Sequence, residues 1–160
     1  MKSWPEPVER VTAFLGHAGA EVRVEEFPGG TPTAQDAAEA IGCKLGEIVK
    51  SLVFECDGRA VLAMIPGDRH ADAAKIARAV DAEKARVASA ERVRELTGFE
   101  PGAVAPFPPS RVDRVLIDQH LLLYEHVWVG AGSETHVARI APAELIRLSR
   151  AVHLDLVADP

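Results

Sequence analysis

Lys50 is the residue whose type and position most clearly suggest a chemical role, because it interrupts an apolar stretch. The run Ile48–Phe54 is rich in β-branched and aromatic residues, which favours a strand. Side chains alternate between the faces of a strand, so Lys50 shares its face with Leu52 and Phe54. A lysine on an apolar face must reach solvent, meet an anion or lose its charge. Two interpretations stay open: Lys50 extends past the strand end to water, or its cation points into a pocket that binds an anion or polarises a carbonyl group.

Two glycine-rich segments could present backbone groups to a ligand. Residues 98–107 combine glycines with prolines, and such a loop can offer N–H groups to a ligand oxygen at little entropic cost. An ordinary connecting loop has the same composition. The second segment, Gly130-Ala131-Gly132-Ser133, follows an apolar run. Taken alone it reads as a hairpin turn, because it lacks the last glycine of a dinucleotide-binding fingerprint and another strand follows.

Several common catalytic patterns are missing from the sequence. The six histidines form no HExxH or other short metal-ligand spacing, so we assign no metal and no cofactor. No Gly-x-Ser-x-Gly elbow supports a Ser-His-Asp hydrolase. A phosphate-binding loop is excluded around Lys50, because Val49 replaces the required glycine and a strand follows where that loop needs a helix.

Composition describes an ordinary globular protein that carries a modest negative charge. The 160 residues are 48% hydrophobic and 26% charged, which suits one domain. Cys43 and Cys56 make neither a disulfide framework nor a zinc site, so we expect two reduced thiols. The net charge of -6 argues against a protein that coats DNA or RNA through bulk electrostatics, but it allows one that grips only the end of an RNA.

The ends of the sequence carry no targeting signal that we can identify. Residues 2–10 are polar and broken by proline, unlike a signal peptide. No run approaches the roughly 20 apolar residues of a membrane helix. We therefore expect a cytoplasmic protein without a membrane partner.

Capping residues mark where helices should begin. Ser3, Thr33 and Ser89 are typical N-cap residues, and each precedes a run with apolar residues on one helical face. We expect helices after Ser3, after Thr33, across residues 72–80 and 90–97, and from Pro142 onwards. Gly19, Gly42 and Gly98 should end the first, second and fourth of these helices.

Strands separate these helices. Two β-rich runs, 48–56 and 60–65, flank Asp57-Gly58, which is a strong hairpin signal. Further strands are expected at residues 22–27, 112–118, 127–129, 137–140 and 152–157. Since helices and strands are interspersed, the sequence predicts the α/β class: one domain over residues 1–160, with a mixed β-sheet or barrel surrounded by helices.

Together these segments resemble the YbaK/EbsC family of aminoacyl-tRNA deacylases, which includes the editing domain inserted in bacterial prolyl-tRNA synthetases. The order and spacing of the matching stretches hold from about Phe27 to Val157. Each stretch fits a generic α/β protein, and their combination carries the resemblance. They are Thr33-Ala34-Gln35-Asp36-Ala37-Ala38, Ile48–Phe54, Thr97-Gly98-Phe99 with Gly102–Phe107, Val115–Asp118 and Val127–Gly132.

The resemblance implies a role for each segment singled out above. Lys50 matches the lysine on which family deacylases depend, which favours the pocket interpretation over the solvent one. Gly102 begins a GxxxP loop whose backbone holds the ester carbonyl or the ribose, and we assign it with Lys50 to catalysis. The substrate-binding residues implied are Ser51, Ala103, Val104, Ala105, Pro106, Gly130, Ala131 and Gly132.

The implied activity is trans-editing: hydrolysis of the ester that joins a wrong amino acid to tRNA. The partners would be the acceptor end of aminoacyl-tRNA and prolyl-tRNA synthetase. Some free-standing members carry an acid a few residues after the Gly-rich segment, but none stands at the nearest aligned position within residues 134–137. This difference weighs against cysteinyl-tRNA, and we favour proline tRNA that carries a small amino acid such as alanine.

Two other functions fit the same residues. The chain could be a non-catalytic module of this fold that binds tRNA or a synthetase, with Lys50 as a phosphate contact. It could also be a hydrolase of small esters or free nucleotides that needs no tRNA. Release of amino acid from charged tRNA separates these alternatives from editing.

Overall fold

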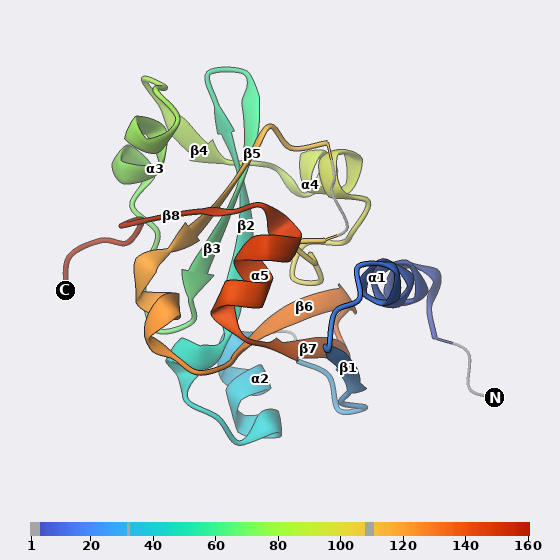
Figure 1. Ribbon diagram of the computed structural model, residues 1–160. Helices are drawn as coiled ribbons and strands as arrows, with labels where there is room; N and C mark the ends of the chain where they lie inside the picture. The colour runs from blue at the N-terminus through green and yellow to red at the C-terminus, as the bar shows by residue number, and fades with distance from the viewer. Residues whose placement is uncertain (1–3, 32, 108–110) are drawn as a thin grey trace.

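The computed structural model describes residues 4–31, 33–107 and 111–160, and it divides the strands between two sheets (Figure 1). The larger sheet has the order β4-β2-β3-β5-β8 and the smaller one β1-β7-β6. The predicted mixed α/β fold is confirmed. The strands are β1 (Arg23–Glu26), β2 (Val49–Cys56), β3 (Arg59–Pro66), β4 (Ala85–Val87), β5 (Arg114–Asp118), β6 (Val127–Ser133), β7 (His136–Ile140) and β8 (Val152–Leu154). The helices are α1 (Glu6–His17), α2 (Ala34–Ile41), α3 (Ala73–Ala79), α4 (Ala90–Thr97) and α5 (Pro142–Ser149), with 3-10 turns η1 (Leu45–Glu47) and η2 (Gln119–Leu123).

The larger sheet is mixed. β2 pairs antiparallel with β3 and β4, whereas β5 runs parallel to both β3 and β8. Asp57 and Gly58 join β2 to β3 with φ angles of 49° and 83°. Positive φ at both central residues fits the type I′ turn, whose twist matches that of the flanking strands. The predicted hairpin is therefore confirmed.

The smaller sheet corrects one expectation about the Gly-rich segment. Residues Gly130–Gly132 lie inside β6, and the turn to β7 falls at Glu134 and Thr135. The pairing of β6 with β7 shifts register between Gly130 and Ser133, as in a β-bulge. Gly132 has a φ of +104°, and a Cβ atom there would lie 2.8 Å from the backbone carbon of Pro7 in the first turn of α1. The glycines thus permit a bulge and a close approach rather than a turn.

Two apolar clusters cover the faces of the larger sheet. One contains Val53 with Val129 of the smaller sheet and Val11 of α1, so it fills the space between the sheets. The other contains Phe54 and packs against α3 through Ile76. Since Val53 and Phe54 are neighbours in β2, successive side chains enter opposite clusters, as a strand requires.

Helix starts agree with the capping signals where the structure describes them. The Thr33 hydroxyl accepts a 3.0 Å hydrogen bond from the Asp36 N–H, and the Ser89 hydroxyl accepts one of 3.2 Å from Arg92. Ser3 lies outside the described residues, and Pro5 occupies the N-cap position of α1 without a side-chain hydrogen bond. Within the described ranges, every helix is too short or too polar to cross a lipid bilayer.

Candidate active site

A cavity of about 280 Å³ opens where the start of β2, the loop after α4 and the smaller sheet meet. It brings together five of the residues predicted for the site, from segments up to 80 residues apart: Lys50, Ser51, Gly102, Val104 and Gly130. The other five predicted residues do not border it. Ala103, Ala105, Pro106, Ala131 and Gly132 are buried and are not among the residues that line the cavity.

Lys50 is half-buried near the start of β2, where it borders the cavity. Its ammonium group donates a 2.7 Å hydrogen bond to the backbone oxygen of Arg69. Burial lowers the pKa of Lys50, and the nearby carboxylate of Asp68 counteracts part of that shift. One carbonyl satisfies one of the three donors of an ammonium group, so Lys50 keeps donors for a ligand in the cavity.

Ser51 extends from the opposite face of β2, as strand alternation predicts. Lys50 lies opposite Ile65 of the α3-side cluster, and Ser51 lies opposite Met64 of the cluster between the sheets. The Ser51 hydroxyl is buried and has no hydrogen-bond partner among the described residues. Buried hydroxyl groups nearly always have a partner, and Ser51 borders the cavity, so its hydroxyl is a candidate contact for a ligand there.

The loop that follows α4 presents backbone groups to the cavity. Ala103 donates a 2.9 Å hydrogen bond to the Glu100 carbonyl, closing a turn in which Gly102 has a φ of +86°. The Ala103 N–H is therefore occupied, and Pro106 has no N–H to offer. Gly102 and Val104 border the cavity, and within the described chain neither N–H donates to a backbone carbonyl. These two groups are the candidate donors to a ligand oxygen.

Gly130 brings β6 into direct contact with this loop. A Cβ atom at position 130 would lie 2.9 Å from the carbonyl oxygen of Val104. Next to it, the Gly132 N–H donates a 3.2 Å hydrogen bond to the carbonyl oxygen of Ala103. The glycines of β6 thus let the loop pack directly against the strand, and Gly130 also borders the cavity.

His136 is a pocket residue that the sequence reasoning missed. It borders the cavity at 1% exposure, and its Nδ1 lies 2.6 Å from the Ser133 hydroxyl. Its Nε2 lies 3.7 Å from a carboxylate oxygen of Glu26, and Trp4 packs edge-on against the ring. The spacing of metal ligands does not single out His136. Strand periodicity does indicate it, because His136 alternates with Ala138 and Ile140 on the buried face of a strand.

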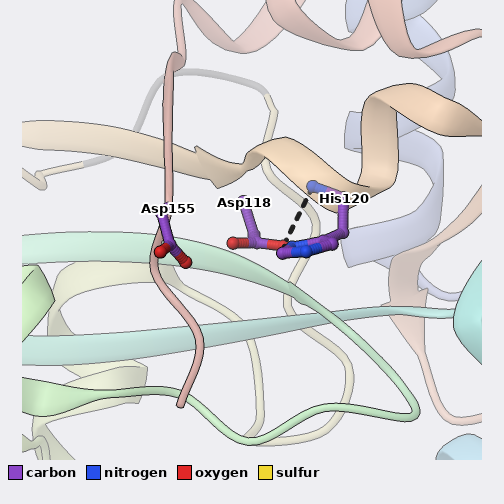
Figure 2. A group of neighbouring side chains, drawn as sticks. All are labelled: Asp118, His120 and Asp155. Atoms are coloured by element: carbon purple, nitrogen blue, oxygen red, sulfur yellow. Dashed lines mark hydrogen bonds and ion pairs between the residues drawn. The ribbon is translucent and has the colours of Figure 1, made fainter. Parts of the chain in front are cut away.

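A second cluster of ligand-type side chains consists of Asp118, His120 and Asp155 (Figure 2). Asp118 is fully buried, and its carboxylate accepts hydrogen bonds from His120 and from the Leu156 N–H. Asp155 forms a 2.9 Å ion pair with Lys75, which lowers the pKa of its carboxyl group. These bonds tie the end of β5 to the C-terminal segment and to α3. The cluster therefore has a structural role, and none of its three residues borders the cavity.

Residues 29–148 match the family described as the aminoacyl-tRNA editing domain. The uncharacterized protein YwhH of Bacillus subtilis (strain 168) is 35% identical over 127 residues, which cover 79% of this chain and 80% of YwhH. A proline–tRNA ligase of Maridesulfovibrio salexigens is 29% identical over 135 residues, or 82% of this chain. The match spans 23% of that ligase, so the chain corresponds to about a quarter of it.

A solved structure gives the same result in three dimensions. The crystal structure of a candidate trans-editing enzyme for prolyl-tRNA synthetase superposes with a TM-score of 0.90 at 36% sequence identity. The superposition covers 98% of this chain and 100% of the other. Because the superposition covers nearly the whole chain, it includes the segments that form the cavity.

Proposed function

Because the chain belongs to the family of aminoacyl-tRNA editing domains, we propose that it hydrolyses the ester between a wrongly attached amino acid and the terminal adenosine of tRNA. The arrangement that supports this activity most is the meeting, across one small cavity, of a cation with backbone N–H groups that have no partner among the described residues. Lys50 supplies the cation, and Gly102 and Val104 supply the N–H groups. Such donors stabilise the oxyanion that develops when a carbonyl group is attacked.

The reaction needs no nucleophilic side chain. The oxygen of a water molecule forms a bond to the ester carbonyl carbon, and the negative charge moves to the carbonyl oxygen. The N–H groups of Gly102 and Val104 bind this oxygen, while Lys50 stays cationic and fixes the ester or the terminal phosphate. The bond from carbon to the ribose oxygen then breaks, and the ribose oxygen takes up the proton that the water gives away, relayed by the neighbouring ribose hydroxyl.

Positioning and oxyanion stabilisation suffice for this substrate. Aminoacyl esters hydrolyse readily, so the enzyme has less barrier to lower than a peptidase has. One oxyanion donor typically contributes about 3 kcal/mol of transition-state stabilisation. Holding the ester and water in line adds to that contribution.

The cavity favours a small amino acid. At about 280 Å³ it lies at the low end of ligand pockets, and its apolar wall includes Trp128 and Val137. One methylene group changes binding by only about 1–3 kcal/mol, so discrimination between similar side chains is modest. We take alanine as the amino acid removed and proline tRNA as its carrier. The resemblance to proline–tRNA ligase and to the solved trans-editing protein supports that tRNA, with prolyl-tRNA synthetase as the partner.

A panel of charged tRNAs tests this function. Purified protein is incubated with alanyl-, cysteinyl-, seryl- and prolyl-tRNA made on proline tRNA, and with alanyl-tRNA made on alanine tRNA. We expect fast release of alanine from proline tRNA and slow release of proline. Binding of every tRNA without release of any amino acid would instead identify a non-catalytic binding module.

A further inference from the structure

Two arginines face each other on the outer surface of the smaller sheet. Arg23 of β1 and Arg139 of β7 are direct partners in the antiparallel ladder, and both side chains are exposed. The Cβ atoms of such partners lie about 5 Å apart, and like charges in these positions destabilise a sheet. A pair of this kind is unfavourable unless an anion compensates for it.

In the part of the chain that the structure describes, the protein does not provide that anion. Within residues 4–31, 33–107 and 111–160, neither guanidinium group has a carboxylate at ion-pair distance, whereas Arg92, Arg94 and Arg147 each pair with a glutamate. Arg139 instead donates a 3.0 Å hydrogen bond to Nδ1 of His126. Because arginine can only donate, that imidazole nitrogen must be an unprotonated acceptor.

The arginine pair lies beside the proposed active site. Arg139 is the ladder partner of Trp128 on its other side, so Trp128, Arg139 and Arg23 form one row across the three strands. Trp128 borders the cavity that contains Lys50, and Val137, two residues before Arg139 on the same face, also borders it. Arg139 is therefore adjacent to two residues that border the cavity, Trp128 and Val137.

A separate groove of about 730 Å³ lies over β1, β7 and the start of α5. Arg23, Arg139 and His126 line it, together with Glu21, Glu25 and Glu144. Glu144 is paired with Arg147. Glu25 lies opposite Val137, one row away from the arginines. The two arginines thus share one row, which is next to the row of Val137 and Gly130 on the same face of the sheet.

We propose that Arg23 and Arg139 bind the backbone phosphates of the tRNA 3′ end while the terminal aminoacyl-adenosine occupies the cavity. The proposal rests on the editing function proposed above. A guanidinium group binds phosphate oxygens in a bidentate fork, and two of them side by side suit a chain of phosphates. The row also explains how an acidic protein could bind a polyanion. A protein of net charge -6 must attract tRNA through a local basic site rather than through its whole surface.

The test compares the double variant R23A/R139A with a matched control. R86A/R114A also removes two exposed strand arginines that make no ion pair among the described residues, and it changes the net charge equally. Binding of uncharged proline tRNA is measured by fluorescence anisotropy as a function of salt. Each lost phosphate contact lowers the salt slope by about 0.7 for a single strand. We expect R23A/R139A to bind at least about tenfold more weakly, with a slope reduced by about 0.7–1.4, and the control to match the wild type.

Activity measurements separate this proposal from the editing function itself. For R23A/R139A, the ratio of kcat/KM on alanyl-tRNA to kcat/KM on 3′-O-alanyl-adenosine, which has the ester but no phosphate, should fall about tenfold. Wild-type affinity and salt slope in this variant would overturn the phosphate site, as would an equal loss in the control. If the wild type hydrolysed no ester, the editing function would fail, and the binding data would still decide whether the arginines hold tRNA.

Discussion

Gly130 and the Val104 carbonyl group are in contact with no room for a side chain between them: a Cβ atom on Gly130 would stand 2.9 Å from the Val104 oxygen. This contact sets the distance between strand β6 and the loop that carries the candidate oxyanion donors. The geometry of the cavity therefore depends on the absence of a side chain at position 130.

Gly130→Ala should displace the loop and reduce deacylation. The neighbour is backbone rather than a flexible side chain, so the methyl group can fit only if the loop or the strand moves, at about 1–3 kcal/mol of unfolding free energy. Denaturant unfolding and kcat measure the two effects. Gly16→Ala is the control, because no atom lies within 4 Å of its Cβ position and alanine favours a helix. Wild-type kcat in Gly130→Ala would show that the contact does not position the loop.

Lys50→Ala should lower kcat by at least about 100-fold while the protein stays folded. The charge acts in the transition state, so kcat should fall more than binding weakens. The fold loses one hydrogen bond to the Arg69 carbonyl, about 1 kcal/mol, and is relieved of a half-buried charge. Lys50→Arg should also lower kcat, because a forked guanidinium group does not replace a compact ammonium group. Exposed Lys84→Ala serves as the control, and fast hydrolysis by Lys50→Ala would refute the mechanism.

The alkaline limb of the pH profile should report Lys50. Burial lowers its pKa from the ordinary value of 10.5, so kcat, corrected for spontaneous hydrolysis, should fall with a midpoint below that value as the ammonium group loses its proton. The Asp68 carboxylate raises this pKa, so Asp68→Asn should move the midpoint to lower pH. Glu91→Gln, at an exposed position of α4, should leave the midpoint unchanged. A midpoint that does not move in Asp68→Asn would mean that another group titrates.

Ser51→Ala should weaken substrate binding without weakening the fold. Its hydroxyl is buried without a partner among the described residues, so its removal leaves the unfolding free energy unchanged or raises it by about 1 kcal/mol. If the hydroxyl binds the substrate, KM should rise roughly tenfold, the equivalent of one good hydrogen bond. Ser149→Ala is the matched control: its hydroxyl donates to the Leu145 carbonyl, so it should cost stability and spare KM. An unchanged KM in Ser51→Ala would remove Ser51 from the site.

Local signals suffice for much of this fold. Thr33, Ser89 and Asp57-Gly58 determine their helix starts and turn through neighbouring residues, so the sequence predicts them correctly. The division into two sheets depends on pairings between distant segments, which no local pattern encodes. Strand β4 has only three residues, which are too few to show a periodic pattern in the sequence.

The site is predictable in part for the same reason. Strand alternation and family resemblance indicate Lys50 and the Gly102 loop. They cannot show that Gly130 and Gly132 serve backbone contacts inside a strand, because Val104 and Pro7 approach from elsewhere in the chain. His136 borders the cavity opposite Ser133, where the β6–β7 pairing shifts register, which is likewise a tertiary feature.

The cavity wall also has a consequence for how the protein folds. The N–H and hydroxyl groups of Thr31 both donate to the Glu134 carbonyl, at 2.6 and 2.7 Å, closing a loop of 103 residues. Contacts between such distant residues form late, since chain entropy must be lost before they contribute, whereas the β2–β3 hairpin needs only its neighbours. A nascent chain can therefore hold Lys50 in a finished strand long before the cavity exists. Hydrolysis should be the last native property to appear on refolding and the first to vanish when the two sheets loosen.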